Sequence, residues 1–295
     1  MTVRLRTYRS ARMRRPVVMA VIVATSLLMA ATALAAVVPT VGLGNAEPFA
    51  VLAGQTITNA NATTITGNVG LDPGTSVTGF GSVTLVPPSV LHVDDAVAEA
   101  AKAALTTAYL DAFGRSLTSP LIPTELGGQT LVGGVYAADS GTFQITSGVL
   151  TLDGENNPDT VWIFKMGSEL LASSGGSFLL TRGAQACNVF WQVGSSATIG
   201  SGASFVGTIL ALTSIFIQSG ATIQGRALAQ NGEVTMDNNT ITRAVCLPSG
   251  PVDTGGGSTS GIENGRLLLI GAILLTGSFG IVTTRRRHPR RGLSS

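Results

Sequence analysis

Short runs in which apolar residues alternate with small or polar residues fill the chain between residues 185 and 246. Residues 203–206 and 221–224 are two such runs, and alternation of this kind is typical of strands with one buried face. The runs recur at a spacing of 18 residues, so that Ser204, Thr222 and Thr240 fall in one column. A fixed repeat indicates one structural unit per repeat, stacked on its neighbours. Because 18 residues hold about three short strands, the pattern predicts an all-β solenoid with a triangular cross-section, and a β-sandwich with chance periodicity is the alternative.

Similar alternation precedes the repeat block, and one segment departs from it. Residues 49–54, 56–59, 63–67 and 76–80 read as strands with Thr on the outward side. From Asp94 or Asp95, which suit a helix N-cap, apolar residues instead recur at helical spacing. We therefore expect one long α-helix, over about residues 94–113, packed alongside the solenoid.

Apolar runs at the two ends of the chain have a different character. Six Arg precede the run over residues 17–36, and residues 33–35 supply a small-x-small cleavage pattern, which predicts a signal peptide over residues 1–35. An uncleaved anchor is the alternative. Residues 266–284 form a second apolar run followed by a basic tail, residues 285–295, so we expect a transmembrane anchor with the tail in the cytoplasm.

Residues 248–265 are rich in Gly, Ser, Thr and Pro, which predicts a flexible stalk between the anchor and a domain spanning residues 36–247. This layout resembles a sortase signal, but the Leu-Pro-x-Thr-Gly motif is incomplete at residues 247–250. Plain membrane anchoring at the cell surface is therefore favoured over covalent attachment to the wall.

Composition supports this interpretation. The chain has 295 residues, of which 37 are Gly and only 5% are aromatic, as suits stacked coils with a narrow core. The formal charge of +2 is misleading because the basic residues gather at the ends. Residues 36–264 carry six Lys or Arg against sixteen Asp or Glu, a net charge of −10 that argues against a nucleic-acid partner.

Cys187 and Cys246 are the only cysteines. In an exported chain, two cysteines that bracket the repeat block suggest a disulfide that fixes the last coil, and two unpaired thiols are the alternative.

Little in the sequence points to catalysis. Two His and no cluster with metal-ligand spacing leave no catalytic residue or cofactor to nominate. The acidic segment 153–159 is rich in Asp, Gly, Asn and Pro, which a surface turn uses, and a Ca²⁺ site or a polysaccharide-cleaving site is the alternative. We therefore expect a protein that is not an enzyme.

Several blocks of the sequence carry a family resemblance. These are residues 49–54, 126–131, 183–194, 207–211 and 237–240. Across about residues 46–246 the chain resembles the ice-binding-protein-like domain family (DUF3494). The resemblance implies a right-handed, discontinuous β-solenoid with a parallel α-helix, in which N-terminal strands complete coils begun by the C-terminal part. It also implies an ice-binding face.

Outward hydroxyls in register on such a solenoid form a regular grid, because neighbouring strands are ~4.8 Å apart and alternate residues ~6.7 Å apart. The candidate ice-binding residues are Thr56, Thr58, Thr64, Thr66, Ser76, Thr78, Ser204, Thr222, Thr240 and Thr242. Thr is also a common outward strand residue, and Val206 and Gln224 interrupt the columns. We expect a monomeric cell-surface protein that binds ice, with a non-enzymatic adhesin or structural module of the same fold as the alternative.

Overall fold

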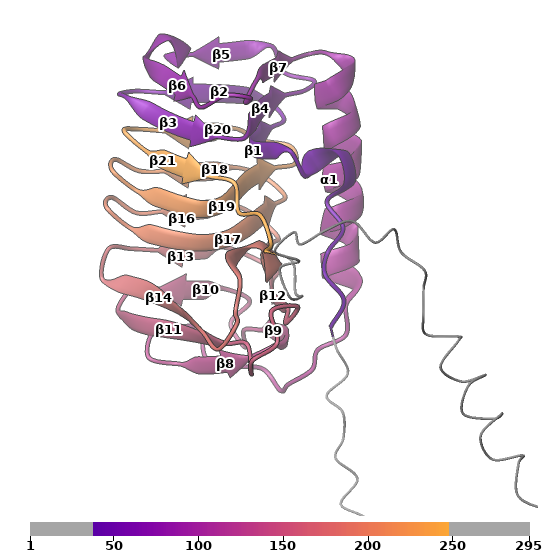
Figure 1. Cartoon of the computed structure of the whole chain (residues 1–295), viewed down its shortest axis with the longest axis vertical. Helices are drawn as coiled ribbons and strands as arrows, with labels where there is room; N and C mark the ends of the chain where they lie inside the picture. The colour runs from indigo at the N-terminus through magenta and orange to yellow at the C-terminus, as the bar shows by residue number, and fades with distance from the viewer. Residues whose placement is uncertain (1–37, 248–295) are drawn as a thin grey trace, which may run out of the picture. The chain divides into compact units, whose positions relative to one another are not determined.

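Parallel strands stack into three faces in the computed structural model, which describes residues 38–247 (Figure 1). The first face, here the seven-stranded face, is one sheet in the order β10 (Phe143–Ile145), β13 (Leu170–Ala172), β16 (Ala197–Ile199), β18 (Ile215–Ile217), β20 (Val234–Met236), β2 (Thr56–Asn59) and β5 (Ser76–Thr78). The predicted solenoid with a triangular section is confirmed.

An eleven-stranded sheet supplies the other two faces. Its main path is β6 (Val83–Leu85), β3 (Thr63–Thr66), β21 (Thr240–Thr242), β19 (Thr222–Ala229), β17 (Ser204–Ala211), β15 (Val189–Val193), β12 (Trp162–Met166) and β9 (Gly134–Ala137). Off this path lie β1 (Phe49–Ala53), β4 (Asn68–Leu71) and β7 (Leu91–Val93). A three-stranded sheet of β14 (Gly176–Thr181), β11 (Gly148–Asp153) and β8 (Thr130–Val132) completes the strands.

The two long strands turn a corner without a break. β17 and β19 have eight residues each and pair over their whole length, whereas the strands of the next face have three. Gly207 and Gly225 stack at the corner, where a Cβ on Gly225 would lie 1.8 Å from the carbonyl oxygen of Gly207. A coil thus contains one long bent strand and one short strand, rather than three of equal length.

The N-terminal strands form the last coils of the solenoid. β1 pairs with β19, β2 with β20, and β3 with β21, so strands about 175 residues apart in the sequence lie side by side. The expected discontinuous solenoid is confirmed. β1 is buried along its entire length, so the predicted alternation with an outward Thr side is wrong for this strand.

That burial comes from the helix α1 (Ala96–Gly114), which covers the face made by β1, β4, β12, β15 and the second halves of β17 and β19, the helix-covered face (Figure 1). Asp95 is its N-cap, and its carboxylate accepts hydrogen bonds from the backbone nitrogens of Val97 and Ala98 at 3.0 and 2.8 Å. Ala101, Leu105 and Ala108 are fully buried against the sheet. Val97, which the helical spacing placed on the buried stripe, is instead 48% exposed.

Aromatic rings fill the solenoid interior where the coils are widest. The rings of Phe164 and Trp191 stack with centroids 4.1 Å apart, and Phe205 packs against Trp191 at 5.4 Å. The indole nitrogens of Trp162 and Trp191 donate to the carbonyls of Leu131 and Val206. Each large ring is therefore packed with its polar atom satisfied, as buried polar atoms generally are.

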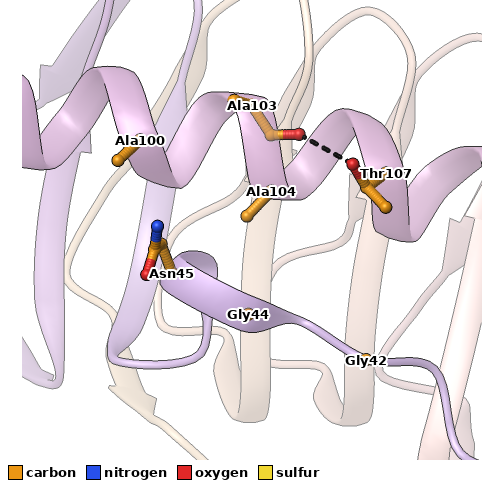
Figure 2. Close-up of a pocket in the computed structure, with 7 residues that line it drawn as sticks. All are labelled: Gly42, Gly44, Asn45, Ala100, Ala103, Ala104 and Thr107. Carbon is orange, nitrogen blue, oxygen red and sulfur yellow. Dashed lines mark hydrogen bonds between the residues drawn. The ribbon is translucent and has the colours of Figure 1, made fainter.

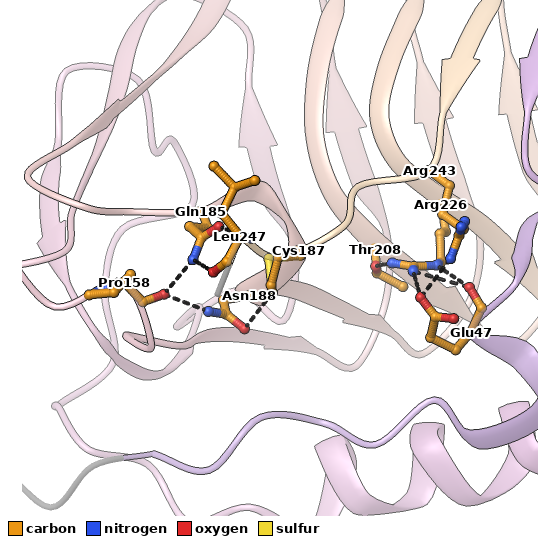
Figure 3. Close-up of a disulfide and its surroundings, with 10 residues drawn as sticks. Glu47, Pro158, Gln185, Cys187, Asn188, Thr208, Arg226, Arg243 and Leu247 are labelled. Carbon is orange, nitrogen blue, oxygen red and sulfur yellow. Dashed lines mark hydrogen bonds and ion pairs between the residues drawn. A yellow bond between two sulfur atoms is a disulfide. The ribbon is translucent and has the colours of Figure 1, made fainter. Parts of the chain in front are cut away.

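The chain leaves the solenoid through the C-terminal strap, residues 243–247, which descends from β21. Cys246 in the strap bonds to Cys187, with Cα atoms 5.4 Å apart, which confirms the predicted disulfide (Figure 3). The amide of Leu247 donates to the side chain of Gln185 at 2.7 Å. At the upper end of the strap, Arg243 pairs with Glu47, which also holds the buried Arg226.

The predicted signal peptide, stalk, transmembrane segment and basic tail lie outside the described residues. Among residues 38–247, the structure contains no helix long and apolar enough to cross a membrane.

Candidate functional site

The seven-stranded face carries an outward column of side chains, one from each strand. Inward residues such as Ile215 and Ile217 of β18 are buried, while the residue between them points outward. Every pair of neighbouring strands in this sheet is in direct register. The outward column is Gln144, Leu171, Thr198, Phe216, Thr235, Thr58 and Thr78. Seven strands at ~4.8 Å intervals make this column about 29 Å long.

This column contains no ionisable side chain. Three kinds of group alternate along it: hydroxyl with methyl from Thr, apolar from Leu171 and Phe216, and one amide from Gln144. At one end the hydroxyl of Thr78 donates to that of Thr58 at 3.2 Å. Thr56 and Ser76 pair beside them, and the Thr56 hydroxyl donates to the Glu233 carboxylate at 3.4 Å. Charge therefore reaches only the margin of this face.

A second exposed surface, the hydroxyl face, is built from β6, β3, β21 and the first halves of β19 and β17. Ser204, Thr222, Thr240, Thr64 and Thr84 form one column in direct register, and all five are exposed. Val206, Gln224, Thr242 and Thr66 form a parallel column. The hydroxyl of Thr222 donates to that of Ser204 at 3.3 Å, so neighbouring hydroxyls along the column constrain one another.

The hydroxyl face is less even than the seven-stranded face. A recess lies between its two columns and is lined by Ser204, Phe205, Val206, Thr222, Ile223, Gln224, Thr240 and Thr242. Beyond β17 the register ladder stops, because β14 belongs to a separate sheet. There the exposed side chains become apolar, with Leu179 52% and Val149 42% exposed. The unbroken part of the hydroxyl column spans five strands, about 19 Å.

The helix-covered face has no comparable surface, because α1 lies over it. A shallow hollow remains between α1 and the N-terminal segment that includes the 3₁₀ helix η1 (Gly44–Ala46), as Figure 2 shows. Gly42, Gly44, Asn45, Ala100, Ala103, Ala104 and Thr107 line this hollow. The Thr107 hydroxyl is already donated to the carbonyl of Ala103 at 3.2 Å. Small side chains and a satisfied hydroxyl leave the hollow without chemistry for a specific ligand.

The ten residues predicted from sequence as an ice-binding grid are divided between two faces. Thr64, Thr66, Ser204, Thr222, Thr240 and Thr242 lie on the hydroxyl face, whereas Thr56, Thr58, Ser76 and Thr78 lie on the seven-stranded face. Sequence reasoning missed Thr84, Thr198 and Thr235. Thr198 has Phe216 in its column 18 residues later, and Thr235 follows at 19, so the change of residue type and of spacing hid that column.

The acidic segment 153–159 is a surface turn held by ionic and backbone contacts. Arg182 forms two hydrogen bonds of 2.6 Å with the Asp153 carboxylate, and these lower the pKa of Asp153. Asp153 also accepts from the backbone nitrogen of Glu155 at 2.9 Å. Within residues 38–247, no three His, Cys, Asp or Glu side chains gather as a metal site would require. The turn interpretation therefore accounts for the segment.

Taken together, these features define a class of protein: a β-solenoid whose coils present long, regular and uncharged outward columns of side chains. The description Ice-binding-like applies to a family that matches residues 51–242, and the chain belongs to this family.

Relatives and solved structures support the assignment. The chain is 44% identical to the ice-binding protein of Nostoc sp. strain HG1 over 207 residues, which is 68% of this chain and 74% of that protein. It is 36% identical to an ice-binding protein of Colwellia over 68% of this chain and 83% of the other. The crystal structure of an ice-binding protein from an Antarctic biological consortium aligns with a TM-score of 0.68 and 43% identity, covering 71% of this chain and 93% of that one.

Proposed function

We propose that this protein binds ice through the seven-stranded face. The observation that supports the proposal is the unbroken register of its seven strands, which sets one outward side chain every ~4.8 Å along a straight column. The ice-binding names of the relatives point to the ligand, and the register points to the face.

Ice differs from an ordinary ligand because it is a flat lattice of hydrogen-bonded water. A surface that binds it must hold water in a regular layer without paying much ordering entropy on contact. Thr side chains suit this task, since branching at Cβ restricts their χ1 angle while each presents a hydroxyl beside a methyl. Apolar groups such as Leu171 and Phe216 limit competing hydrogen bonds with liquid water. The seven-stranded face combines both kinds of group and carries no charge in its column.

The seven-stranded face is favoured over the hydroxyl face as the principal site because its column is longer and its ladder is unbroken. Binding to a crystal adds many weak contacts that form together, so total strength depends on the extent of the surface that fits at once. About 29 Å of regular column offers more such contacts than about 19 Å interrupted by a recess.

The first prediction tests this face with one bulky substitution. Thr235→Tyr places a ring at an inner position of the column, where it would hold a flat crystal away from the neighbouring side chains. Because Thr235 faces outward, the free energy of unfolding should change by no more than about 0.5 kcal/mol. We expect the concentration needed to inhibit ice recrystallisation to rise at least about tenfold. Thr107→Tyr, on the exposed side of α1, is the matched control and should behave like the parent.

A folded parent domain without any effect on recrystallisation would refute ice binding, and a non-enzymatic adhesin of the same fold would then be the remaining interpretation. A Thr235→Tyr variant that folds and equals the parent would instead show that another face carries the activity.

We also propose that the domain is exported and held at the cell surface by the apolar run at residues 266–284. The basic residues that follow this run, and the signal-like N-terminus, support the location.

A further inference from the structure

We propose that the hydroxyl face is a second ice-binding surface, which engages a crystal plane different from that engaged by the seven-stranded face. This inference rests on the proposed function and extends it to a separate set of residues. The five-residue column Ser204, Thr222, Thr240, Thr64 and Thr84 is its centre.

The chemistry of the hydroxyl face suits ordered water. All five residues of its main column carry an exposed hydroxyl, and four of them carry a methyl beside it. The parallel column adds Thr242 and Thr66, and none of the nine positions in the two columns is ionisable. Charged groups would bind liquid water strongly and irregularly, so a long surface without them favours a regular water layer.

The recess between the columns fits a single file of water. Residues at alternate positions of a strand lie ~6.7 Å apart, which leaves room for about one water molecule between facing side chains on each strand. Phe205 and Ile223 turn inward at the intermediate position, so their backbone forms the floor of the recess. Waters in this file would repeat at the ~4.8 Å strand spacing and bridge hydroxyls of neighbouring strands.

The hydroxyl groups are also held in place before any ice arrives. The hydrogen bond from Thr222 to Ser204 joins two neighbouring strands at 3.3 Å. Below the surface, the ring of Phe205 packs against Trp191 and Phe178, and Ile223 is 2% exposed. Because the strands beneath are fixed by the core, little conformational entropy remains to be lost when the surface meets a crystal.

Geometry then requires a second plane. The hydroxyl face and the seven-stranded face are two sides of a three-sided solenoid, so they are not coplanar (Figure 1). A flat crystal surface can contact only one of them at a time. If both bind, the protein recognises two orientations of ice, and one molecule can contact two grains that meet at a boundary.

The second prediction is tested by labelling a single ice crystal with fluorescent protein and recording which planes acquire label. The parent should label two sets of planes. Thr222→Tyr should remove one set and leave the other, whereas Thr235→Tyr should have the reverse effect, and the double variant should label neither. Thr222→Val keeps the side-chain shape without the hydroxyl and should retain more label than Thr222→Tyr.

Melting temperatures must match the parent for the labelling to be interpreted, and Thr240→Tyr replaces Thr222→Tyr if the latter does not fold. Folded Thr222→Tyr protein that labels every plane as the parent does would overturn the inference. So would a parent that labels a single set of planes lost in Thr235→Tyr alone, although the proposed function would then stand. A parent that labels no plane would remove both.

Discussion

Lys102 shows how a single residue fastens α1 to the solenoid. Its side chain is 7% exposed, and its amine donates to the carbonyl oxygen of Ala229 at 2.8 Å and also to that of Gln230. Burial lowers the pKa of Lys102 to about 8, although the charge of Asp72 opposes this shift. A neutral amine keeps two N–H donors, so both carbonyls stay bonded after the proton is lost.

The third prediction follows from this pKa. In the unfolded chain Lys102 keeps its proton until about pH 10.4, but in the folded protein it loses the proton near pH 8. The unfolded state therefore binds more protons between these values, and stability rises with pH across that window. We expect the free energy of unfolding to increase by about 1 to 2 kcal/mol from pH 8 to pH 10. The increase should be absent from Lys102→Met.

Urea unfolding at several pH values measures this effect. Arg226 also has a lowered pKa, about 10, so measurements should stop at pH 10 to limit its contribution. A parent whose stability is flat or falls between pH 8 and pH 10, with Lys102→Met behaving identically, would show that Lys102 does not titrate in this range.

Sequence alone reached part of the residue pattern. The 18-residue period aligned Ser204, Thr222 and Thr240, and these three do occupy one column. Thr64 and Thr84 join that column through pairing of β3 with β21, strands about 175 residues apart, which no local period can reveal. Sequence could not assign the N-terminal Thr residues to faces, because alternation says which side of a strand is outward but not which face the strand belongs to.

At the scale of elements, the strap and its disulfide close the lower part of the repeat block. The bond from Cys187 to Cys246 links residues separated by 59 positions. Gln185 and Asn188, which flank Cys187, both donate to the carbonyl of Pro158, so the bond ties the strap to a region that is itself well connected (Figure 3). The pairing was open from sequence, since two cysteines in an exported chain can also remain free, and the Cα separation of 5.4 Å resolves it.

The fourth prediction concerns the removal of this bond. The double variant Cys187→Ser with Cys246→Ser should be less stable by roughly 4 kcal/mol, because a closed loop of about 60 residues restricts the unfolded chain. Ice binding near 0 °C should persist, since neither outward column contains a strap residue. Chemical denaturation and a recrystallisation assay measure the two effects separately. Equal stability of the parent and the double variant would mean that the strap is held by its other contacts alone.

The prediction of elements succeeded where periodicity was strong and failed where burial was unusual. Alternation identified the strands of the repeat block, and the Asp cap together with helical spacing identified α1. The uniform burial of β1 was missed because it depends on a helix that packs over the strand from the far side. The bent strands β17 and β19 were missed because an inward-to-outward change at Gly207 and Gly225 resembles a strand boundary in sequence.

For the whole molecule, the arrangement of faces determines what the protein can contact. α1 occupies the helix-covered face, which leaves the seven-stranded face and the hydroxyl face open to solvent in the described part of the chain. Neither open column carries charge, although the region from residue 36 to 264 has a net charge of −10. Negative charge therefore lies away from the two columns, where it favours solubility without disturbing water on the faces.

The final prediction joins the domain to its proposed location. If residues 266–284 anchor the protein, the full chain should remain with the cells, and a chain ending at Gly250 should be found in the medium. Cells with the full chain should then attach to an ice surface, whereas cells releasing the shorter chain should not, because free protein occupies the ice instead. The full chain carrying Thr235→Tyr separates the two properties: it should stay with the cells but attach them weakly. Recovery of both the full and shortened chains as soluble cytoplasmic protein would contradict export and anchoring together.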